Sequence, residues 1–209
     1  MKRKTMLALA LAALGASPAF AAGNFYILGA GGVTHANIDE GEINSEITAA
    51  GLTLLSSSTD NNDTGYKLQL GYQFSPNFAI EGGYVDLGKF LYSASVTGGN
   101  ATGEAKADGW NIGLVGMMPL PNNFGLFAKL GTINAKVKTR VTAVVTGGTA
   151  SVDESATKWK PNLGLGATWM VSKNLGIRLE YEEFYDLGEK DRTGESDVSL
   201  LSVGLSYRF

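Results

Sequence analysis

Apolar and polar residues alternate with a period of two through most of the chain after residue 22. The clearest example is the segment 66–74, where rings and leucines alternate with polar residues and glycine. Its apolar face consists of Tyr66, Leu68, Leu70, Tyr72 and Phe74. A period of two predicts a β-strand whose two faces meet different surroundings.

The same pattern recurs and predicts eight strands in all. They cover residues 24–34, 66–74, 78–85, 110–118, 124–130, 159–169, 175–182 and 201–209. The phase of the first is ambiguous because Phe25, Tyr26, Ile27 and Leu28 are continuously apolar. The short connections are 75–77, 119–123 and 171–174, and the long polar ones are about 35–63, 88–105, 139–156 and 186–197. An even strand number with alternating short and long connections is typical of an outer-membrane β-barrel.

The aromatic residues indicate which face of the predicted barrel meets lipid. The apolar faces carry twelve rings: Tyr66, Tyr72, Phe74, Phe78, Tyr84, Trp110, Phe124, Trp159, Trp169, Tyr181, Tyr207 and Phe209. The interior of an eight-stranded barrel holds little beyond ordinary side chains, which argues against a soluble lipocalin-like cup with these rings inside. The rings also gather near the strand ends, where two aromatic belts are expected. The alternative is a soluble β-sandwich with an aromatic core. We predict an all-β fold: an eight-stranded antiparallel up-and-down transmembrane β-barrel.

The first 21 residues read as a secretory signal peptide. Lys2, Arg3 and Lys4 form a positive end, residues 6–14 form a short apolar core, and residues 19–21 are a small-x-small cleavage site. The alternative, a membrane anchor or amphipathic helix, requires a longer apolar run or a second face. The expected domains are therefore a signal peptide, 1–21, and a barrel, 22–209.

Composition narrows the class of protein further. The chain has 209 residues, a net charge of −3 and no cysteine. An acidic chain does not suggest binding to nucleic acid, and the lack of cysteine excludes disulfides and thiolate metal sites.

Several charged residues occupy the predicted inward face. Glu81 and Arg178 lie on opposite walls of the ring, each four residues beyond a short turn. The full inward set is Glu81, Arg178, Lys129, Glu180, Lys67 and Glu182. Buried charges need partners, so we expect an internal ion-pair network. It is either a structural plug or the gate of a narrow ion path.

No segment shows a convincing catalytic, cofactor or metal site. The single histidine, His35, lies at the start of a long connection, and a barrel enzyme that hydrolyses lipid or peptide is the competing hypothesis. Residues 60–63, Asp-Asn-Asn-Asp, lack the spacing of a calcium loop and are expected to be a solvated loop tip. Residues 29–32 are rich in glycine, which favours close strand packing rather than phosphate binding.

Charge is unevenly distributed in the long connections. Residues 22–66 contain six acidic residues and no arginine or lysine before Lys67. A basic group lies at the ends of two neighbouring strands: Lys136, Lys138, Arg140, Lys158 and Lys160. These five residues suggest a basic rim facing lipopolysaccharide phosphates, or else scattered solvated lysines.

Particular motifs resemble the OmpA-like N-terminal transmembrane β-barrel family. The similarity lies in residues 71–77 (GYQFSPN), in Glu81-Gly82-Gly83-Tyr84, in Trp159-Lys160-Pro161, and in the last two predicted strands. It covers nearly all of residues 22–209, although the long connections match nothing familiar. Two departures stand out. The similarity ends at Phe209, so we expect no peptidoglycan-binding domain. Of the family's four-charge interior cluster, only Glu81 and Arg178 carry over, since Val115 and Thr168 stand at the other two positions.

The resemblance implies a location and a set of partners. It implies a multi-pass barrel in the outer membrane of a Gram-negative bacterium, with both termini in the periplasm. It also implies insertion by the outer-membrane assembly machinery with periplasmic chaperones, which read a terminal signal such as Tyr207 and Phe209. The expected partners are outer-membrane lipids, lipopolysaccharide and host or surface ligands of the loops. The predicted function is non-enzymatic, structural and interactive, without a cofactor; the alternative is a narrow or gated pore for ions or small solutes.

Overall fold

The computed structural model describes residues 24–49, 53–145, 148–190 and 192–209. The predicted signal peptide, residues 1–21, lies outside these ranges. Within them, no helix is long and apolar enough to cross a membrane.

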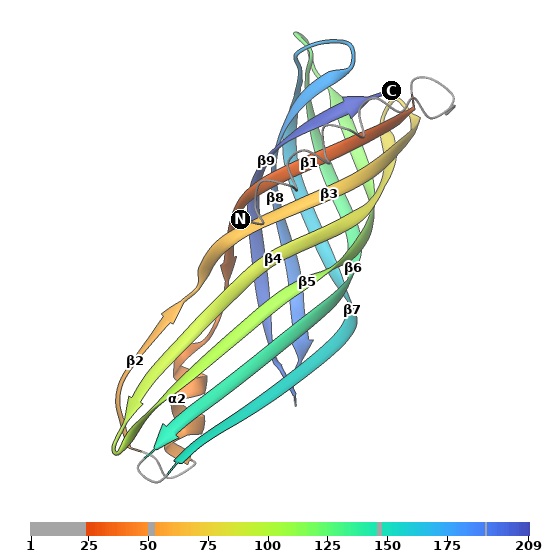
Figure 1. Cartoon of the computed structure of the whole chain (residues 1–209). Helices are drawn as coiled ribbons and strands as arrows, with labels where there is room; N and C mark the ends of the chain where they lie inside the picture. Colours follow the sequence, from red (N-terminus) through yellow and green to blue (C-terminus); the bar gives the residue numbers. More distant parts are fainter. Residues whose placement is uncertain (1–23, 50–52, 146–147, 191) are drawn as a thin grey trace, which may run out of the picture.

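Antiparallel strands make up almost the whole structure (Figure 1). The strands are β1 (Phe25–Ala36), β2 (Leu54–Asp60), β3 (Asn62–Ser75), β4 (Phe78–Val96), β5 (Gly99–Pro119), β6 (Phe124–Val145), β7 (Gly148–Met170), β8 (Leu175–Glu189) and β9 (Gly194–Arg208). One helix, α2 (Glu40–Ala49), stands between β1 and β2.

Eight of these strands close into a ring. Their order is β4-β3-β1-β9-β8-β7-β6-β5, and β4 pairs with β5 to complete the circle. β2 lies outside this ring, because among the described residues it pairs only with the far end of β4. The structure therefore confirms the predicted eight-stranded antiparallel barrel.

Alternating side chains explain why these segments form the wall. On β3 the residues Tyr66, Leu68 and Leu70 are exposed on the outside, whereas Lys67 and Gln69 are buried inside. Rings on neighbouring strands pair on the outer wall, as in Phe124–Trp169, with centroids 6.0 Å apart. The wall is thus apolar on the outside and polar within, which is the arrangement expected of a barrel in lipid.

The first strand adopts a definite phase in the structure. Tyr26 and Leu28 are buried on the inside, and Ile27 faces outward. The glycines that follow allow close packing, as predicted: a Cβ at Gly32 would lie 1.9 Å from the carbonyl oxygen of Leu201 on β9.

The predicted short turns are confirmed, but the four long connections are not the polar loops we expected. β4 and β5 remain paired as far as Val96 and Gly99, and β6 and β7 as far as Val145 and Gly148. β8 and β9 continue to Glu189 and Gly194 in the same way, and the first long connection contains α2 and β2. These residues are polar yet still alternate, and hydrogen bonding to a neighbouring strand continues after the wall leaves the lipid. Polarity alone was a poor sign of a strand end.

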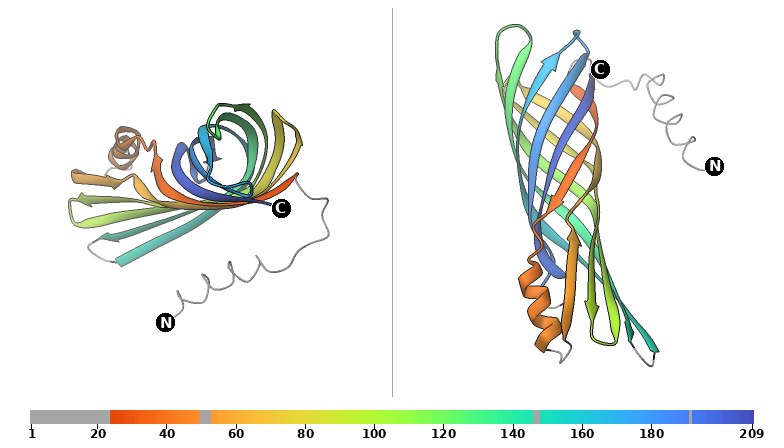
Figure 2. Two further views of the ribbon diagram at one scale, coloured as in Figure 1. Left: turned by 90° about the horizontal axis from the view of Figure 1, so that it is seen from above. Right: turned by 90° about the vertical axis from the view of Figure 1, so that its left-hand side faces the viewer.

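Beyond the ring, five strands continue as an open sheet, which we call the outer sheet (Figures 1 and 2). Its order is β2-β4-β5-β6-β7. It separates from the rest because the β7–β8 pairing ends at Asn162 and Phe184. Helix α2 lies against one face, where Asn44 accepts a hydrogen bond from Tyr92 Oη at 2.6 Å. We call this end of the molecule the hairpin end, and the opposite end the short-turn end.

Candidate functional site

The six inward charged residues predicted from the sequence meet inside the ring. They come from β3, β4, β6 and β8, and all six are buried. We call them the lumen cluster: Lys67, Glu81, Lys129, Arg178, Glu180 and Glu182. With three cations and three carboxylates, its formal charges balance.

Ion pairs join the whole lumen cluster. Arg178 donates to both carboxylate oxygens of Glu81, at 3.2 Å for Nη2–Oε2, and its Nε lies 3.0 Å from Glu180 Oε2. Lys67 Nζ lies 2.7 Å from Glu180 Oε2 and 2.8 Å from Glu182 Oε2. Lys129 Nζ lies 2.9 Å from Glu182 Oε1. Each charge therefore has an opposite partner, which is what allows it to stay in a dry interior.

Neutral residues complete the cluster, and the sequence reasoning did not identify them. Tyr26 Oη donates to Glu81 Oε1 at 2.6 Å, and Asn162 Nδ2 donates to Glu182 Oε1 at 2.6 Å. The amide groups of Gln69 and Asn111 lie 2.8 Å apart beside them. The guanidinium of Arg178 also stacks on Phe127, 3.9 Å from the ring centroid. The alternation of apolar and polar residues indicates that Gln69, Asn111 and Asn162 point inward, so it could have identified them. It could not identify Tyr26, because residues 25–28 are all apolar.

Two apolar layers enclose the lumen cluster along the barrel axis. On the short-turn side, Tyr26, Ala79, Val115 and Phe127 pack together. On the hairpin side lies a larger group: Ala36, Val85, Leu87, Phe90, Ala107, Ile133, Ala135, Val137, Phe184, Leu187, Val198 and Leu200. The side chains of Lys67, Lys129 and Glu182 are 0% exposed between these layers. No water-sized space borders these three side chains.

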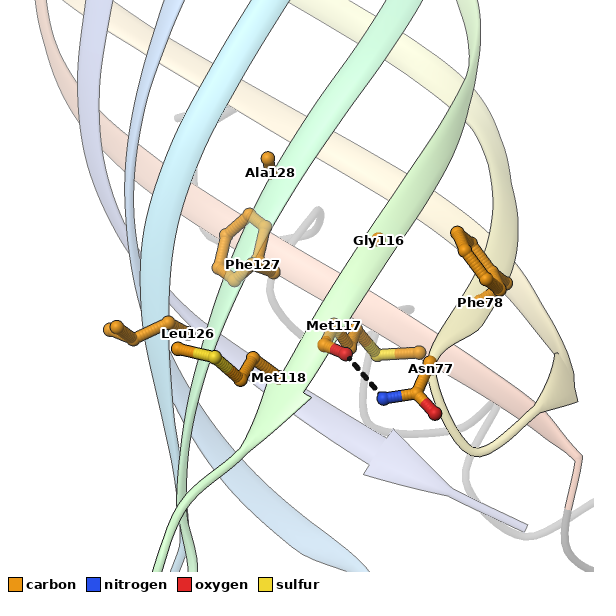
Figure 3. A pocket seen from close by; sticks show the side chains of 8 residues that line it. All are labelled: Asn77, Phe78, Gly116, Met117, Met118, Leu126, Phe127 and Ala128. Atoms are coloured by element: carbon orange, nitrogen blue, oxygen red, sulfur yellow. Dashed lines mark hydrogen bonds between the residues drawn. The ribbon is translucent and has the colours of Figure 1, made fainter.

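A shallow groove on the wall near the short-turn end offers no chemistry (Figure 3). It is lined by Asn77, Phe78, Gly116, Met117, Met118, Leu126, Phe127 and Ala128. Its polar contact is a hydrogen bond of 3.0 Å from Asn77 Nδ2 to the Met117 carbonyl. None of the eight side chains is titratable.

The five residues of the predicted basic rim do not form one patch. Lys136, Lys138 and Arg140 face outward on β6, and Arg140 pairs with Asp153 at 2.5 Å. Lys158 and Lys160 point to the opposite face of the sheet. There they hold the β8–β9 hairpin, at 2.9 Å from Glu189 and 2.7 Å from Glu195. Residues paired across two strands share a face, and Lys158 and Lys160 pair with the inward residues Ala135 and Ile133. The prediction of one rim did not take this register into account.

The remaining candidates lie in ordinary strand surroundings. His35 is exposed on β1, and its Nδ1 lies 3.1 Å from the side-chain oxygen of Asn62. Residues 60–63 are not a loop tip but the junction of β2 and β3, where Asp63 Oδ2 accepts the Lys89 N–H at 2.7 Å. Among the described residues, no three histidine, aspartate or glutamate side chains are grouped so as to hold a metal.

The C-terminal aromatics lie at the short-turn end. The rings of Tyr207 and Phe209 meet edge to face, 5.5 Å apart, and the Phe209 N–H donates to the Phe25 carbonyl at 3.0 Å.

An apolar outer wall with rings near both edges, a polar interior and a closed ring define a transmembrane β-barrel of the Gram-negative outer membrane. Comparison with known proteins agrees. The model of the OmpA-like transmembrane domain matches residues 21–209, and the chain belongs to that family. It is 31% identical over 157 residues to outer membrane protein A of Escherichia fergusonii, covering 72% of this chain and 43% of the relative.

A relative from Klebsiella pneumoniae, also an outer membrane protein A, is 30% identical over 72% of this chain and 42% of its own length. The chain thus spans less than half the length of these curated relatives. Among solved structures, Ail, the attachment invasion locus protein of Yersinia pestis, superposes with a TM-score of 0.50 at 15% identity. It covers 90% of this chain and 99% of its own, which supports the fold.

Proposed function

We propose that this chain is a non-enzymatic outer-membrane barrel with a sealed lumen, which holds the outer sheet above the membrane for surface interactions. The observation that supports the proposal is the buried, charge-balanced lumen cluster, which lies between two apolar layers. A barrel closed in this way adds structure to the membrane without making it permeable.

The outer sheet supplies the interaction surface. Within the described residues, β7 pairs only with β6 from Gly148 to Pro161, so its other edge has no strand partner. An unpaired edge offers backbone donors and acceptors to an extended segment of another protein. Host or surface ligands of peptide character fit this edge better than a small solute does.

We also propose the orientation and the route of assembly. Short turns face the periplasm in outer-membrane barrels, so the hairpin end lies outside the cell, and the start of β1 and the end of β9 both lie on the periplasmic side. Residues 1–21 are then removed on export, and periplasmic chaperones and the assembly machinery read Tyr207 and Phe209. Deletion of Phe209 is expected to reduce the amount of folded barrel in outer-membrane fractions, and an unchanged amount would contradict this role.

Single-channel recording in planar bilayers tests the sealed lumen. The folded protein is expected to add almost no conductance, because no water-filled path runs through the apolar layers. A matched variant with the hairpin-side layer opened, Phe184→Ala with Ile133→Ala, is expected to show rare small openings. Steady conductance by the unmodified protein would contradict the proposal.

One observation favours the alternative, a gated narrow pore. Lys129 Nζ is 2.9 Å from Glu182, and it is also 3.9 Å from both Glu81 and Glu180, so it has several carboxylates to pair with. Exchange between these partners would open and close an ion path. In that case Arg178→Ala and Glu81→Ala would change the open probability, whereas a conductance that ignores both substitutions would exclude the gate.

A further inference from the structure

Three lysines stand side by side on the outer wall at the hairpin end. Strand pairing places Lys89 of β4 opposite Lys106 of β5, and Lys106 opposite Lys138 of β6. We call Lys89, Lys106 and Lys138 the lysine row. Neighbouring strands lie about 4.8 Å apart, so the row spans roughly 10 Å.

A bulge in β4 brings the first lysine into the row. The β4–β5 pairing shifts between Asp86 and Lys89, where Gly88 has a φ of 78°. Two residues, Leu87 and Gly88, therefore oppose a single residue of β5. Lys89 faces outward as a result, and it is exposed.

Like charges directly opposite each other destabilise a sheet, and the row contains two such contacts. Lys106 is partly neutralised by Asp86, 3.2 Å away. Among the described residues, neither Lys89 nor Lys138 has an ion-pair partner within 4.0 Å. The row therefore keeps unpaired positive charge on the wall, and an external anion would relieve the repulsion.

The acidic residues around the row already have partners. Asp86 accepts a hydrogen bond from Tyr66 Oη at 3.1 Å, and Asp108 accepts one from Tyr84 Oη at 2.9 Å.

The charged residues further out along the strands are also paired with one another. Arg140 pairs with Asp153. Glu104 lies opposite Arg140 as well, and Lys136 stands beside Asp108. These contacts leave the ammonium groups of Lys89 and Lys138 free for another ligand.

The height of the row suits the lipid headgroups. Lys106 lies four residues beyond Trp110, which is 65% exposed in the aromatic belt. At about 3.3 Å per residue and a tilt near 40°, the row lies roughly 10 Å above the indole. The headgroups of an ordinary bilayer occupy about 5–8 Å on each side, so the row lies just above them, and the flexible lysine stems reach back into the headgroup layer.

From this register we infer that the lysine row binds the phosphate groups of the lipopolysaccharide that surrounds the barrel in the outer leaflet. Lys89 and Lys138 bind the phosphates directly, and Lys106 between them holds Asp86. The inference rests on the proposed orientation, with the hairpin end outside, but not on a sealed lumen. It replaces the five-residue rim with a site on one face, and it adds Lys89 and Lys106.

Binding to purified lipopolysaccharide by the folded protein in detergent tests the site. The test variant is Lys89→Gln with Lys138→Gln, which leaves the Lys106–Asp86 ion pair intact. The control, Lys173→Gln with Lys190→Gln, removes the same charge at the short turn after β7 and at the hairpin tip. Each lysine near an anionic surface contributes about fivefold, so the test variant is expected to bind at least tenfold more weakly, and the control as the unmodified protein does.

The second probe is the same lipopolysaccharide after removal of its phosphates. The unmodified protein is expected to bind it at least tenfold more weakly than the intact lipid, and the test variant is expected to bind both alike. Folding is checked by heat-modifiable migration; if the double variant fails to fold, each single substitution is tested for its fivefold loss. Unchanged binding by the variants, or no preference for phosphate, would overturn the lysine row alone. A conducting lumen would overturn only the proposed function.

Discussion

The two halves of strand β6 show opposite polarity on the same two faces. In the ring, Lys129 points inward and Leu130, 66% exposed, points outward. Toward the hairpin end, Ile133 and Val137 are buried inside, and Lys138 faces outward. The pairing with β5 and β7 is unbroken throughout, so the strand does not turn over. The surroundings of the strand change instead. The outer face contacts lipid in the ring and water beyond it. The inner face contacts the ion pairs of the lumen cluster in the ring and an apolar layer beyond it.

The largest expected effect is on stability, from removing a cation in the ring. Lys129→Met leaves three buried carboxylates facing two cations. Breaking a buried ion network in this way is expected to lower the free energy of unfolding by about 3–5 kcal/mol. Denaturant titration of the folded protein in detergent micelles measures it.

The control is the same substitution on the same strand outside the ring. Lys138→Met is expected to change the free energy of unfolding by no more than about 0.5 kcal/mol, because the side chain is exposed. Similar losses for the two variants would contradict the contrast between the two halves of β6.

A new charge on the outer face of β7 sharpens the same comparison. Leu165→Arg places a guanidinium on the lipid-facing wall, where Leu165 is 58% exposed, and is expected to cost about 2–4 kcal/mol. Ser155→Arg, further along the same strand, is expected to cost at most about 1 kcal/mol. Unfolding from lipid vesicles measures both. An equal cost at the two positions would mean that Ser155 also lies in the hydrocarbon.

The smallest effect is a pH dependence confined to the hairpin end. The hydrogen bond from Lys158 lowers the pKa of Glu189 below its ordinary value of 4.5. The pair therefore stabilises the hairpin fully above about pH 4.5 and loses this contribution as the pH falls through the lowered pKa. Hydrogen exchange of the Thr193 and Ser196 amides, corrected for intrinsic rates, is expected to quicken as the pH falls below 4.5, while amides of the ring stay protected.

Lys158→Gln is the matched control for this effect. With the cation removed, exchange at the hairpin is expected to lose most of its acid step. An acid step of full size in this variant would assign the titration to another group.

Much of the barrel could be predicted because lipid imposes a strict alternation. The alternation in residues 78–85 and 175–182 indicated which residues point inward, and charged residues at inward positions had to meet near the axis. That reasoning placed Glu81 and Arg178 on opposite walls, and the structure brings them into contact. The outward direction of the aromatic rings followed from the small interior volume of an eight-stranded barrel, which cannot hold them.

The hairpin end was harder to predict for two physical reasons. Water accepts polar residues on either face, so polarity there no longer marks the end of a strand, and residues 139–145 remain paired although they look like a loop. A bulge also changes the phase without changing the composition. The bulge at Leu87 and Gly88 places Lys89 on the outer wall, a shift that only the observed pairing reveals.

The closed lumen is the central claim, and the cysteine-free chain permits a direct measurement of it. Ser202 lies inside the ring at 1% exposure, and Ser155 lies on the outer sheet. A single cysteine is introduced at either position, and a membrane-impermeant maleimide is added to the folded protein in vesicles and in micelles. With a closed lumen, Ser155→Cys is expected to be labelled rapidly, and Ser202→Cys is not labelled until the protein is unfolded. Labelling of Ser202→Cys in the folded barrel at a rate close to that of Ser155→Cys would contradict the closed lumen.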